Sequence, residues 1–157
     1  MVLDEKQRQI IRELQKDAKQ SLRDLGETLN LPVSTVYSRI QKMENEKIID
    51  SYKTIFNAEK VGLPSTAFIL IRLRFSDLVN KIPYDFREIA EKLALLDEVQ
   101  EVHLITGEWD MMVKVKGPST KDIGQFVVDN LRTIEGVDRC TTFVVFDSIK
   151  ETTDLPI

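Results

Sequence analysis

The chain has very few of the residues that build metal centres and disulfides. Among its 157 residues there is one cysteine, Cys140, and one histidine, His103. A lone cysteine cannot form a disulfide within the chain, and such usage is typical of a reducing compartment, so we expect a cytoplasmic protein. One cysteine and one histidine also fall short of the four ligands of a structural zinc site. We therefore expect neither a metal nor a cofactor.

Long apolar segments are also missing. The uninterrupted run "AFILI" at 67–71 is long enough for a strand and too short to cross a bilayer, so we expect no membrane association. The opening residues "MVLDEKQRQ" are too polar for a secretory signal. No Ser-His-Asp set, Walker motif or metal-ligand spacing occurs, which argues against an enzyme. What remains is an ordinary globular composition, with 42% hydrophobic and 31% charged residues.

Charge is unevenly distributed along the chain. Residues 1–56 contain 10 lysines and arginines against 9 aspartates and glutamates, a net charge of +1. Residues 57–157 contain 12 against 17, a net charge of −5, which accounts for the −4 of the whole chain. The acidity therefore belongs to the C-terminal part, and the near-neutral N-terminal part can still present a basic face to a nucleic acid.

Residues 1–56 have the pattern of three short helices. Asp4 and Gln7 are placed as a capping box for the first helix, and Ser21 and Asp24 are placed in the same way for the second. Gly26 lowers helix propensity by about 1 kcal/mol relative to alanine. Its presence inside the second helix predicts a close approach between helices at that position.

A joint at Asn30 and Leu31 leads into the third helix, which we expect to begin at Pro32 and to run to about Glu46. The next stretch, "IIDSYKTIF" at 48–56, alternates and is rich in β-forming residues, so we expect a short ribbon there. Together these elements predict a winged helix-turn-helix.

The pattern changes after "NAEKVGLP" at 57–64, where we place the domain boundary. The following segments predict strands at 66–75, 99–106, 110–117 and 137–149, and helices at 84–96 and 120–134. The order β-α-β-β-α-β is that of the ferredoxin-like fold, an antiparallel sheet with two helices on one face. We therefore predict an α+β protein with a helix-turn-helix domain at 1–56, a linker at 57–65, a ferredoxin-like domain at 66–149 and a C-terminal tail at 150–157.

The third helix has one apolar face and one compact polar face. Ser34, Ser38 and Gln41 follow one another at i, i+4 and i+7 on the polar face. Short polar side chains of this kind reach base edges in the major groove, and lysine or arginine reaches phosphates. A solvated surface helix would show the same pattern. The candidate DNA contacts are Ser34, Thr35, Tyr37, Ser38, Arg39, Gln41, Lys42 and, on the expected ribbon, Lys53.

Three helices, a ribbon, a linker and a β-α-β-β-α-β domain, in that order, resemble the Lrp/AsnC family of transcription regulators. The segments that carry the resemblance include "VSTVYSRIQKME", "VGLP", "ITGEWDMMVKV" and "IEGVDRCTT". The chain departs from the family pattern at Lys47, where glycine usually follows the third helix, and at Pro32, where serine often caps it. Arg39 matches a position that is nearly always arginine in the family, where it contacts a phosphate or braces the fold.

The resemblance implies a DNA-binding regulator that senses a small amino acid. The expected partners are double-stranded DNA carrying a palindromic operator, and further copies of the chain. Homodimers also follow from physical grounds, because single helix-turn-helix units bind weakly and an open sheet offers a pairing surface. The dimers would assemble into tetramers or octamers, and the C-terminal domain would bind the effector and mediate this assembly.

The loop "TGEWD" is the expected centre of the effector site. A turn containing glycine exposes backbone N–H groups that can bind a carboxylate, and Asp110 can accept from an ammonium group. A plain hairpin turn with Trp109 as a packing residue would look the same in sequence. By resemblance, the site lies at a seam between dimers, and its residues are Leu104, Ile105, Thr106, Gly107, Glu108, Trp109, Asp110, Gly124, Val128, Cys140, Thr141, Thr142, Phe143 and Val144.

Two other functions remain as alternatives. Siroheme-type tetrapyrrole decarboxylases resemble the same two-domain architecture, but they would need histidine and arginine groups for the carboxylates of the substrate, and this chain has one histidine. An accessory protein that binds an effector and has lost DNA binding would not need the polar face of the third helix. Both alternatives rank below the regulator.

Overall fold

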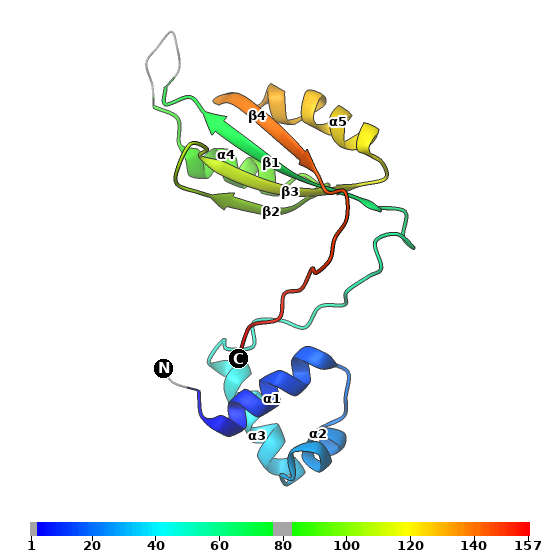
Figure 1. Cartoon of the computed structure of the whole chain (residues 1–157). Coiled ribbons are helices and arrows are strands. Elements are labelled where there is room, and N and C mark those ends of the chain that lie inside the picture. Colours follow the sequence, from blue (N-terminus) through cyan, green and yellow to red (C-terminus); the bar gives the residue numbers. More distant parts are fainter. Residues whose placement is uncertain (1–2, 77–82) are drawn as a thin grey trace. The chain divides into compact units, whose positions relative to one another are not determined.

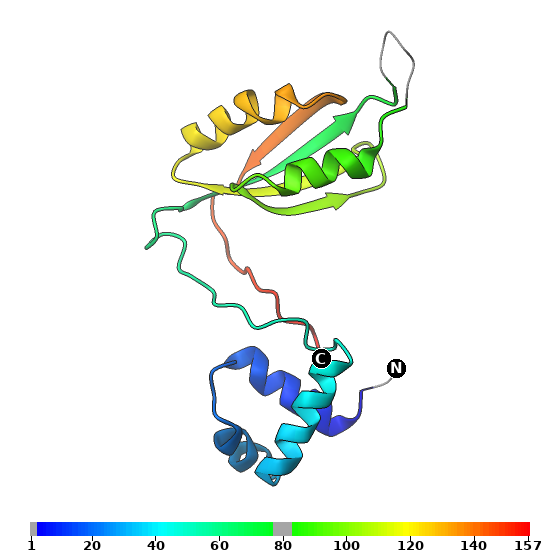
Figure 2. The ribbon, with the colours of Figure 1, turned by 180° about the vertical axis from the view of Figure 1, so that it is seen from behind.

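The computed structural model describes residues 3–76 and 83–157, which form two compact units (Figures 1 and 2). Unit 1 consists of Met1–Ile55 together with Lys150–Ile157, and unit 2 consists of Phe56–Ile149. Unit 1 contains three helices, and unit 2 contains the sheet with its own helices. Within the described ranges, no helix is long and apolar enough to span a bilayer.

Unit 1 is built from α1 (Glu5–Lys16), α2 (Leu22–Leu29) and α3 (Val33–Asn45). Both predicted capping boxes are present, the first between Asp4 and Gln7, where each side chain accepts from the other's backbone N–H at 2.8 and 2.9 Å. The three helices enclose a small core formed by Ile10, Leu25, Val36, Ile40 and Met43.

The joint between α2 and α3 is tight. Asn30 adopts the left-handed conformation, with φ 51° and ψ 48°, which asparagine tolerates better than most residues. The N–H of Leu31 donates to the carbonyl of Gly26 at 2.9 Å. A Cβ on Gly26 would lie only 2.8 Å from the carbonyl oxygen of Leu31. The predicted close approach is therefore confirmed: the nearest atom belongs to the joint, and the first residue of α3, Val33, follows with its Cγ2 at 3.5 Å and its backbone N at 3.7 Å.

The last turn of α3 is a Schellman motif. The N–H of Lys47 donates to the Glu44 carbonyl at 3.1 Å, and the N–H of Ile48 donates to the Met43 carbonyl at 2.8 Å. Lys47 itself takes a left-handed conformation with φ 57°. The helix thus ends as it would with glycine, and the strain of a side chain in this conformation falls on Lys47.

The ribbon predicted at 48–56 is wrong, and the wing is absent with it. The structure has no strand in this stretch, and Ile55 and Phe56 are 85% and 71% exposed. The alternating pattern identifies residues suited to a strand, but a ribbon forms only where a second strand supplies hydrogen bonds. The one sheet found among the described residues lies in unit 2, so this stretch has no strand to pair with.

Unit 2 has the predicted β-α-β-β-α-β order. Its elements are β1 (Ser65–Leu73), α4 (Phe86–Ala94), β2 (Val99–Leu104), β3 (Met111–Gly117), α5 (Thr120–Asp129), a short 3-10 helix η1 (Leu131–Thr133) and β4 (Val137–Val144). The four strands form one antiparallel sheet in the order β2-β3-β1-β4. The predicted ferredoxin-like α+β fold is confirmed.

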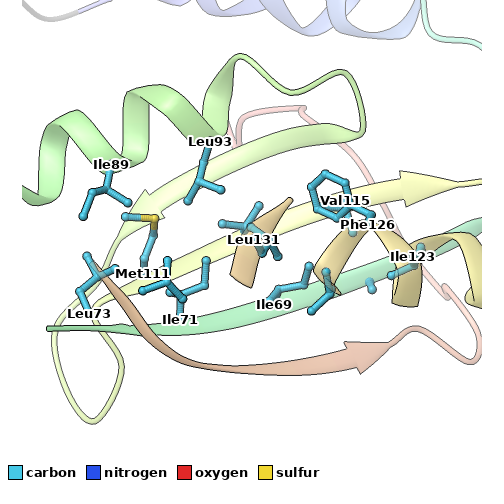
Figure 3. Close-up of a cluster of buried hydrophobic side chains, with 14 residues drawn as sticks. Ile69, Ile71, Leu73, Ile89, Leu93, Met111, Val115, Ile123, Phe126 and Leu131 are labelled. Atoms are coloured by element: carbon cyan, nitrogen blue, oxygen red, sulfur yellow. The ribbon is translucent and has the colours of Figure 1, made fainter. Parts of the chain in front are cut away.

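The strand register decides which side chains face the helices. Ile69 in β1 lies opposite Val113 in β3 and Thr142 in β4, and directly opposed residues of an antiparallel pair share a face. Alternate residues of β1 and β3 therefore pack under α4 and α5 and form the core (Figure 3). The core consists of Ala67, Ile69, Ile71, Leu73, Ile89, Leu93, Met111, Val113, Val115, Ile123, Phe126, Val127, Leu131 and Val137.

The opposite face of the sheet is called the open face below. Both helices of unit 2 lie on the core side (Figures 1 and 2). The register assigns to the open face Thr66, Phe68, Leu70, Arg72, Glu101, His103, Met112, Lys114, Lys116, Arg139, Thr141 and Phe143.

Two elements of unit 2 end five residues earlier than predicted. The helix expected to reach residue 134 ends at Asp129, where the Thr133 hydroxyl donates to the carbonyls of Asp129 and Asn130 and competes with the helical pattern. The last strand ends at Val144 and not at residue 149, because its final partner, Ala67, lies close to the start of β1.

Candidate functional site

One face of α3 is buried and the opposite face is a continuous polar stripe. Val36, Ile40 and Met43 are buried in the core of unit 1. On the opposite face the exposed residues Ser34, Ser38 and Gln41 lie in line, and Tyr37 flanks them with 53% of its surface exposed. Asn45, also exposed, extends the stripe by one more turn. The sequence prediction omitted Asn45, although its spacing of four from Gln41 is a usable signal.

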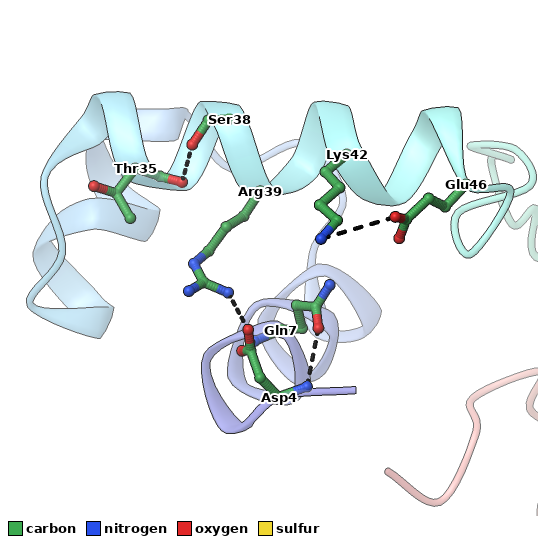
Figure 4. A network of polar contacts seen from close by, with 7 residues as sticks. All are labelled: Asp4, Gln7, Thr35, Ser38, Arg39, Lys42 and Glu46. Atoms are coloured by element: carbon green, nitrogen blue, oxygen red, sulfur yellow. Dashed lines mark hydrogen bonds and ion pairs between the residues drawn. The ribbon is translucent and has the colours of Figure 1, made fainter. Parts of the chain in front are cut away.

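Arg39 stands at the border of this stripe and braces the fold. Its Nη1 lies 2.6 Å from Oδ2 of Asp4, the N-cap of α1 (Figure 4). The hydrogen bond from Arg39 is the main reason why the pKa of Asp4 is lower than usual. Two roles were expected for Arg39. The ion pair with Asp4 shows that it braces the fold, and its contact with a phosphate stays a prediction.

The other polar side chains of α3 make local contacts in the free protein. Ser38 Oγ donates to the Thr35 carbonyl at 3.0 Å, and Lys42 Nζ lies 3.8 Å from Oε1 of Glu46 (Figure 4). Exposed i,i+4 ion pairs of this kind contribute only a few tenths of a kcal/mol, so Lys42 can leave its partner for a phosphate at little cost.

Glu44 links the stripe to the stretch that follows α3. Its carboxylate accepts from Gln41 Nε2 at 2.8 Å and from the Tyr52 hydroxyl at 2.9 Å. Partial burial and, next, the bond to Glu44 raise the pKa of Tyr52 to about 12. Tyr52 therefore stays protonated and anchors its segment, which also carries the exposed Lys53. This contact could not be found from the sequence, because no local pattern connects positions 44 and 52.

The loop between β2 and β3 is shaped by backbone hydrogen bonds at its two ends. The N–H of Ile105 donates to the Asp110 carbonyl at 2.9 Å, and the N–H of Asp110 donates to the Ile71 carbonyl at 3.0 Å. Gly107 has φ 128°, a conformation that favours glycine. Within the part of the chain that the structure covers, no hydrogen bond involves the N–H groups of residues 106–109. The loop can therefore offer backbone donors to an anion.

Asp110 has a structural task in this loop. Its Oδ2 accepts from the N–H of Leu73 at 2.8 Å, at the point where β1 ends. The ammonium group predicted to contact Asp110 would therefore bind chiefly the other carboxylate oxygen, Oδ1.

The predicted effector residues lie on three separate surfaces of unit 2. The loop at 104–110 forms the first. Gly124 and Val128 lie on the exposed side of α5, away from the core. On β4, Thr141 and Phe143 point to the open face, whereas Cys140, Thr142 and Val144 point to the side of the helices. In a single chain these residues do not line one common pocket.

Arg139 is a site residue that the sequence analysis missed. Its guanidinium carbon lies 5.5 Å from the centre of the Trp109 ring, a cation–π distance, so Trp109 packs against Arg139, and its contact with an effector stays a prediction. Arg139 also lies directly opposite Arg72 on the open face. Only the strand register reveals this pair. Like charges in such positions repel, so an anion nearby would be stabilised.

A polar cluster occupies the other half of the open face. Glu101 accepts from Lys114 Nζ at 3.1 Å and lies 3.3 Å from His103 Nε2. Burial would raise the pKa of Glu101, but the hydrogen bonds from Lys114 and His103 outweigh it and lower that pKa below its usual value. His103 is thus a residue of the sheet face. No group of three or more histidine, cysteine, aspartate or glutamate side chains in the described chain is arranged to hold a metal ion.

Comparisons with known proteins identify both units. The AsnC-type helix-turn-helix domain matches residues 3–44, and the Lrp/AsnC ligand binding domain matches residues 66–155. The chain belongs to the Lrp/AsnC family. An HTH-type transcriptional regulator of Pyrococcus horikoshii is 37% identical over 150 residues, which are 96% of this chain and 97% of the relative. The HTH-type transcriptional regulator FL11 of Pyrococcus abyssi is 36% identical over 155 residues, 99% of this chain and 97% of the relative.

A solved structure agrees with this assignment. A transcriptional regulator of Neisseria meningitidis, crystallised as a complex with L-methionine, superimposes with a TM-score of 0.89 at 28% identity, and the match covers 99% of this chain and 97% of the other. The predicted family, fold and role as a transcription regulator are confirmed. These three proteins, similar to this Lrp/AsnC protein, are all named transcriptional regulators, which removes the support for the tetrapyrrole decarboxylase.

Proposed function

We propose that this Lrp/AsnC protein reads a palindromic operator in double-stranded DNA with the polar stripe of α3. The observation that carries the proposal is the division of α3 into a buried face and an exposed face that is polar apart from Val33 and Tyr37. Ser34, Ser38 and Gln41 contact base edges, and Lys42 and Lys53 contact phosphates. Thr35 and Tyr37 line the border of the contact, and a cytoplasmic location is part of this proposal.

The effector is a small amino acid that binds at the loop at 104–110. The free N–H groups of residues 106–109 suit its carboxylate, and Asp110 Oδ1 suits its ammonium group. The L-methionine complex of the Neisseria meningitidis regulator supports this class of ligand. Because Gly124, Val128 and the residues at 140–144 lie on other surfaces, a second copy of the chain supplies the rest of the site.

The open face of the sheet is the dimer surface in this proposal. Phe68, Leu70, Met112 and Phe143 form its apolar part, and none of them is fully buried in the single chain. An apolar sheet face without a covering helix is stabilised when a second copy packs on it. The dimers then assemble into tetramers or octamers, and the effector acts by changing the contact between dimers.

Selection of duplexes from a random DNA library, followed by gel shifts with the selected site, tests the DNA-binding proposal. We expect the double variant Ser38→Ala/Gln41→Ala to lose about tenfold or more in affinity for the selected site. It should keep its weak, salt-dependent binding to unrelated DNA, because phosphate contacts remain. Lys6→Ala, an exposed position on α1, is the matched control and should bind normally. Failure of the folded protein to enrich any sequence at low salt would refute the proposal.

Thermal unfolding in the presence of single amino acids tests the effector. A ligand that binds the native state raises the melting temperature with increasing concentration. We expect one or a few amino acids to do so, and Gly107→Val, which disfavours the φ of the loop, to abolish the shift. A panel without any stabilising amino acid would contradict the effector proposal and leave the DNA proposal intact.

A further inference from the structure

The segment 150–157 lies against α1, whose side chains bind its backbone. Gln15 contacts Leu155 at two points, because the Leu155 N–H donates to Gln15 Oε1 at 2.7 Å and Gln15 Nε2 donates to the Leu155 carbonyl at 3.2 Å. Arg12 Nε donates to the carbonyl of Ile157 at 2.7 Å. Arg12 and Gln15 are three positions apart and therefore share one face of α1.

The segment has a conformation suited to this contact. Pro156 fixes its own φ and restricts Leu155 to extended conformations. The N–H of Ile157 donates to the Leu155 carbonyl at 2.8 Å and closes a small turn around Pro156. A segment constrained in this way loses less conformational entropy when it binds than a flexible one does. The Leu155 side chain remains 62% exposed, so the contact depends on backbone shape.

We propose that this face of α1 is a docking site for residues 154–157 of the same chain, which give unit 1 a second attachment. The chain passes between the two units twice, at residues 55–56 and at residues 149–150. When the segment is docked, unit 1 is attached through both passages, and when it is released, only the first remains. A second attachment restricts the positions that a tethered unit explores, which changes the effective concentration at which it meets a target.

Docking is an equilibrium that small changes can shift. The three hydrogen bonds between the segment and α1 are all exposed to solvent, and each bond of this kind contributes little. None of the docking residues belongs to the polar stripe of α3. Docking of the segment therefore changes how unit 1 is attached to the rest of the chain and leaves the surface that would contact DNA unaltered.

Amide hydrogen exchange in the full chain tests the docking itself. We expect the Leu155 amide to exchange about tenfold more slowly than the same amide in a free peptide of residues 150–157. Gln15→Ala should remove this protection. Gln15→Glu should weaken it too, because the carboxylate keeps the acceptor but faces the Leu155 carbonyl without a donor. Lys6→Ala, on α1 but outside the contact, is the control and should keep the protection. Unprotected Leu155 in the wild-type chain, or protection that survives Gln15→Ala in a chain whose α1 amides exchange normally, would overturn the proposal.

The consequence for DNA rests on the proposed function and has its own readout. We expect Gln15→Ala to change the affinity for a duplex with two half-sites by about threefold or more, and to leave the affinity for a single half-site unchanged. Equal affinities of both proteins for both duplexes would overturn the second attachment as a functional device. Absence of binding by the wild-type chain would instead refute the proposed function, so the two failures are distinguishable.

Discussion

Replacing Lys47 with glycine should stabilise unit 1. Lys47 has φ 57° at the end of α3, where its N–H and that of Ile48 close the Schellman motif. A left-handed conformation costs a residue with a Cβ about 1–2 kcal/mol, and glycine avoids this cost. Glycine also loses more conformational entropy on folding, which offsets about 0.5–1 kcal/mol of this gain in stability. The expected net gain is about 0.5–1 kcal/mol.

Unfolding by urea, followed through the methyl signals of Ile10 and Met43 in the core of unit 1, measures this gain. Lys47→Ala is the matched control, because it removes the charge and keeps the Cβ, and it should change the stability by less than about 0.5 kcal/mol. If Lys47→Gly is no more stable than Lys47→Ala, the strain assigned to this residue does not exist. Lysine in place of the glycine expected after the third helix would then not lower the free energy of unfolding.

Three further predictions follow from single contacts. Gly26→Ala should destabilise unit 1 by about 1–2 kcal/mol despite the better helix propensity of alanine, because its Cβ would meet a backbone carbonyl at 2.8 Å, and an unchanged melting temperature would contradict this. In the folded chain the pKa of Tyr52 is raised from 10.0 to about 12, so its contribution to stability is complete below pH 10.0 and is lost as the pH rises through about 12. An NMR titration should measure this raised pKa and find a lower value in Glu44→Gln. An ordinary pKa of Tyr52 in the unchanged chain would disprove the contact. Asp110→Ala should cost about 1–3 kcal/mol in urea unfolding, since it leaves the N–H at the end of β1 without its acceptor, whereas Asp110→Asn should cost less than about 1 kcal/mol; equal costs would refute this role.

Local sequence patterns were sufficient for the helices of unit 1 and for the order of unit 2. The capping boxes at Asp4 and Ser21 are encoded by residues three positions apart, so a single stretch of sequence contains both partners. The alternation in β1 and β3 likewise reports directly on burial, because every second residue faces the core.

The ribbon at 48–56 shows where local patterns fail. Its residues favour a strand, but pairing depends on a partner strand elsewhere, and propensity does not reveal whether one exists. The same limit applies to the ends of elements: β4 stops at Val144 because β1 begins at Ser65, a fact of register that no pattern within β4 contains.

The candidate sites depend on contacts between distant residues, which the sequence conceals. The polar stripe of α3 follows from spacing alone and was predicted nearly in full. The contact of Arg39 with Asp4 spans 35 positions, and that of Arg139 with Trp109 joins two elements whose proximity depends on the sheet order. The two faces of β4 also divide the predicted effector residues, which only the register could determine.

The proposed function requires the polar stripe of α3 to contact the bases. NMR spectra of the full chain with and without its selected duplex test it directly through the side-chain amide of Gln41, which is bonded to Glu44 in the free protein. We expect DNA to shift this amide signal and the backbone signals of Ser34 and Ser38, while the signals of the open face stay in place. Shifts confined to unit 2, with the signals of α3 unchanged in a saturated complex, would contradict it.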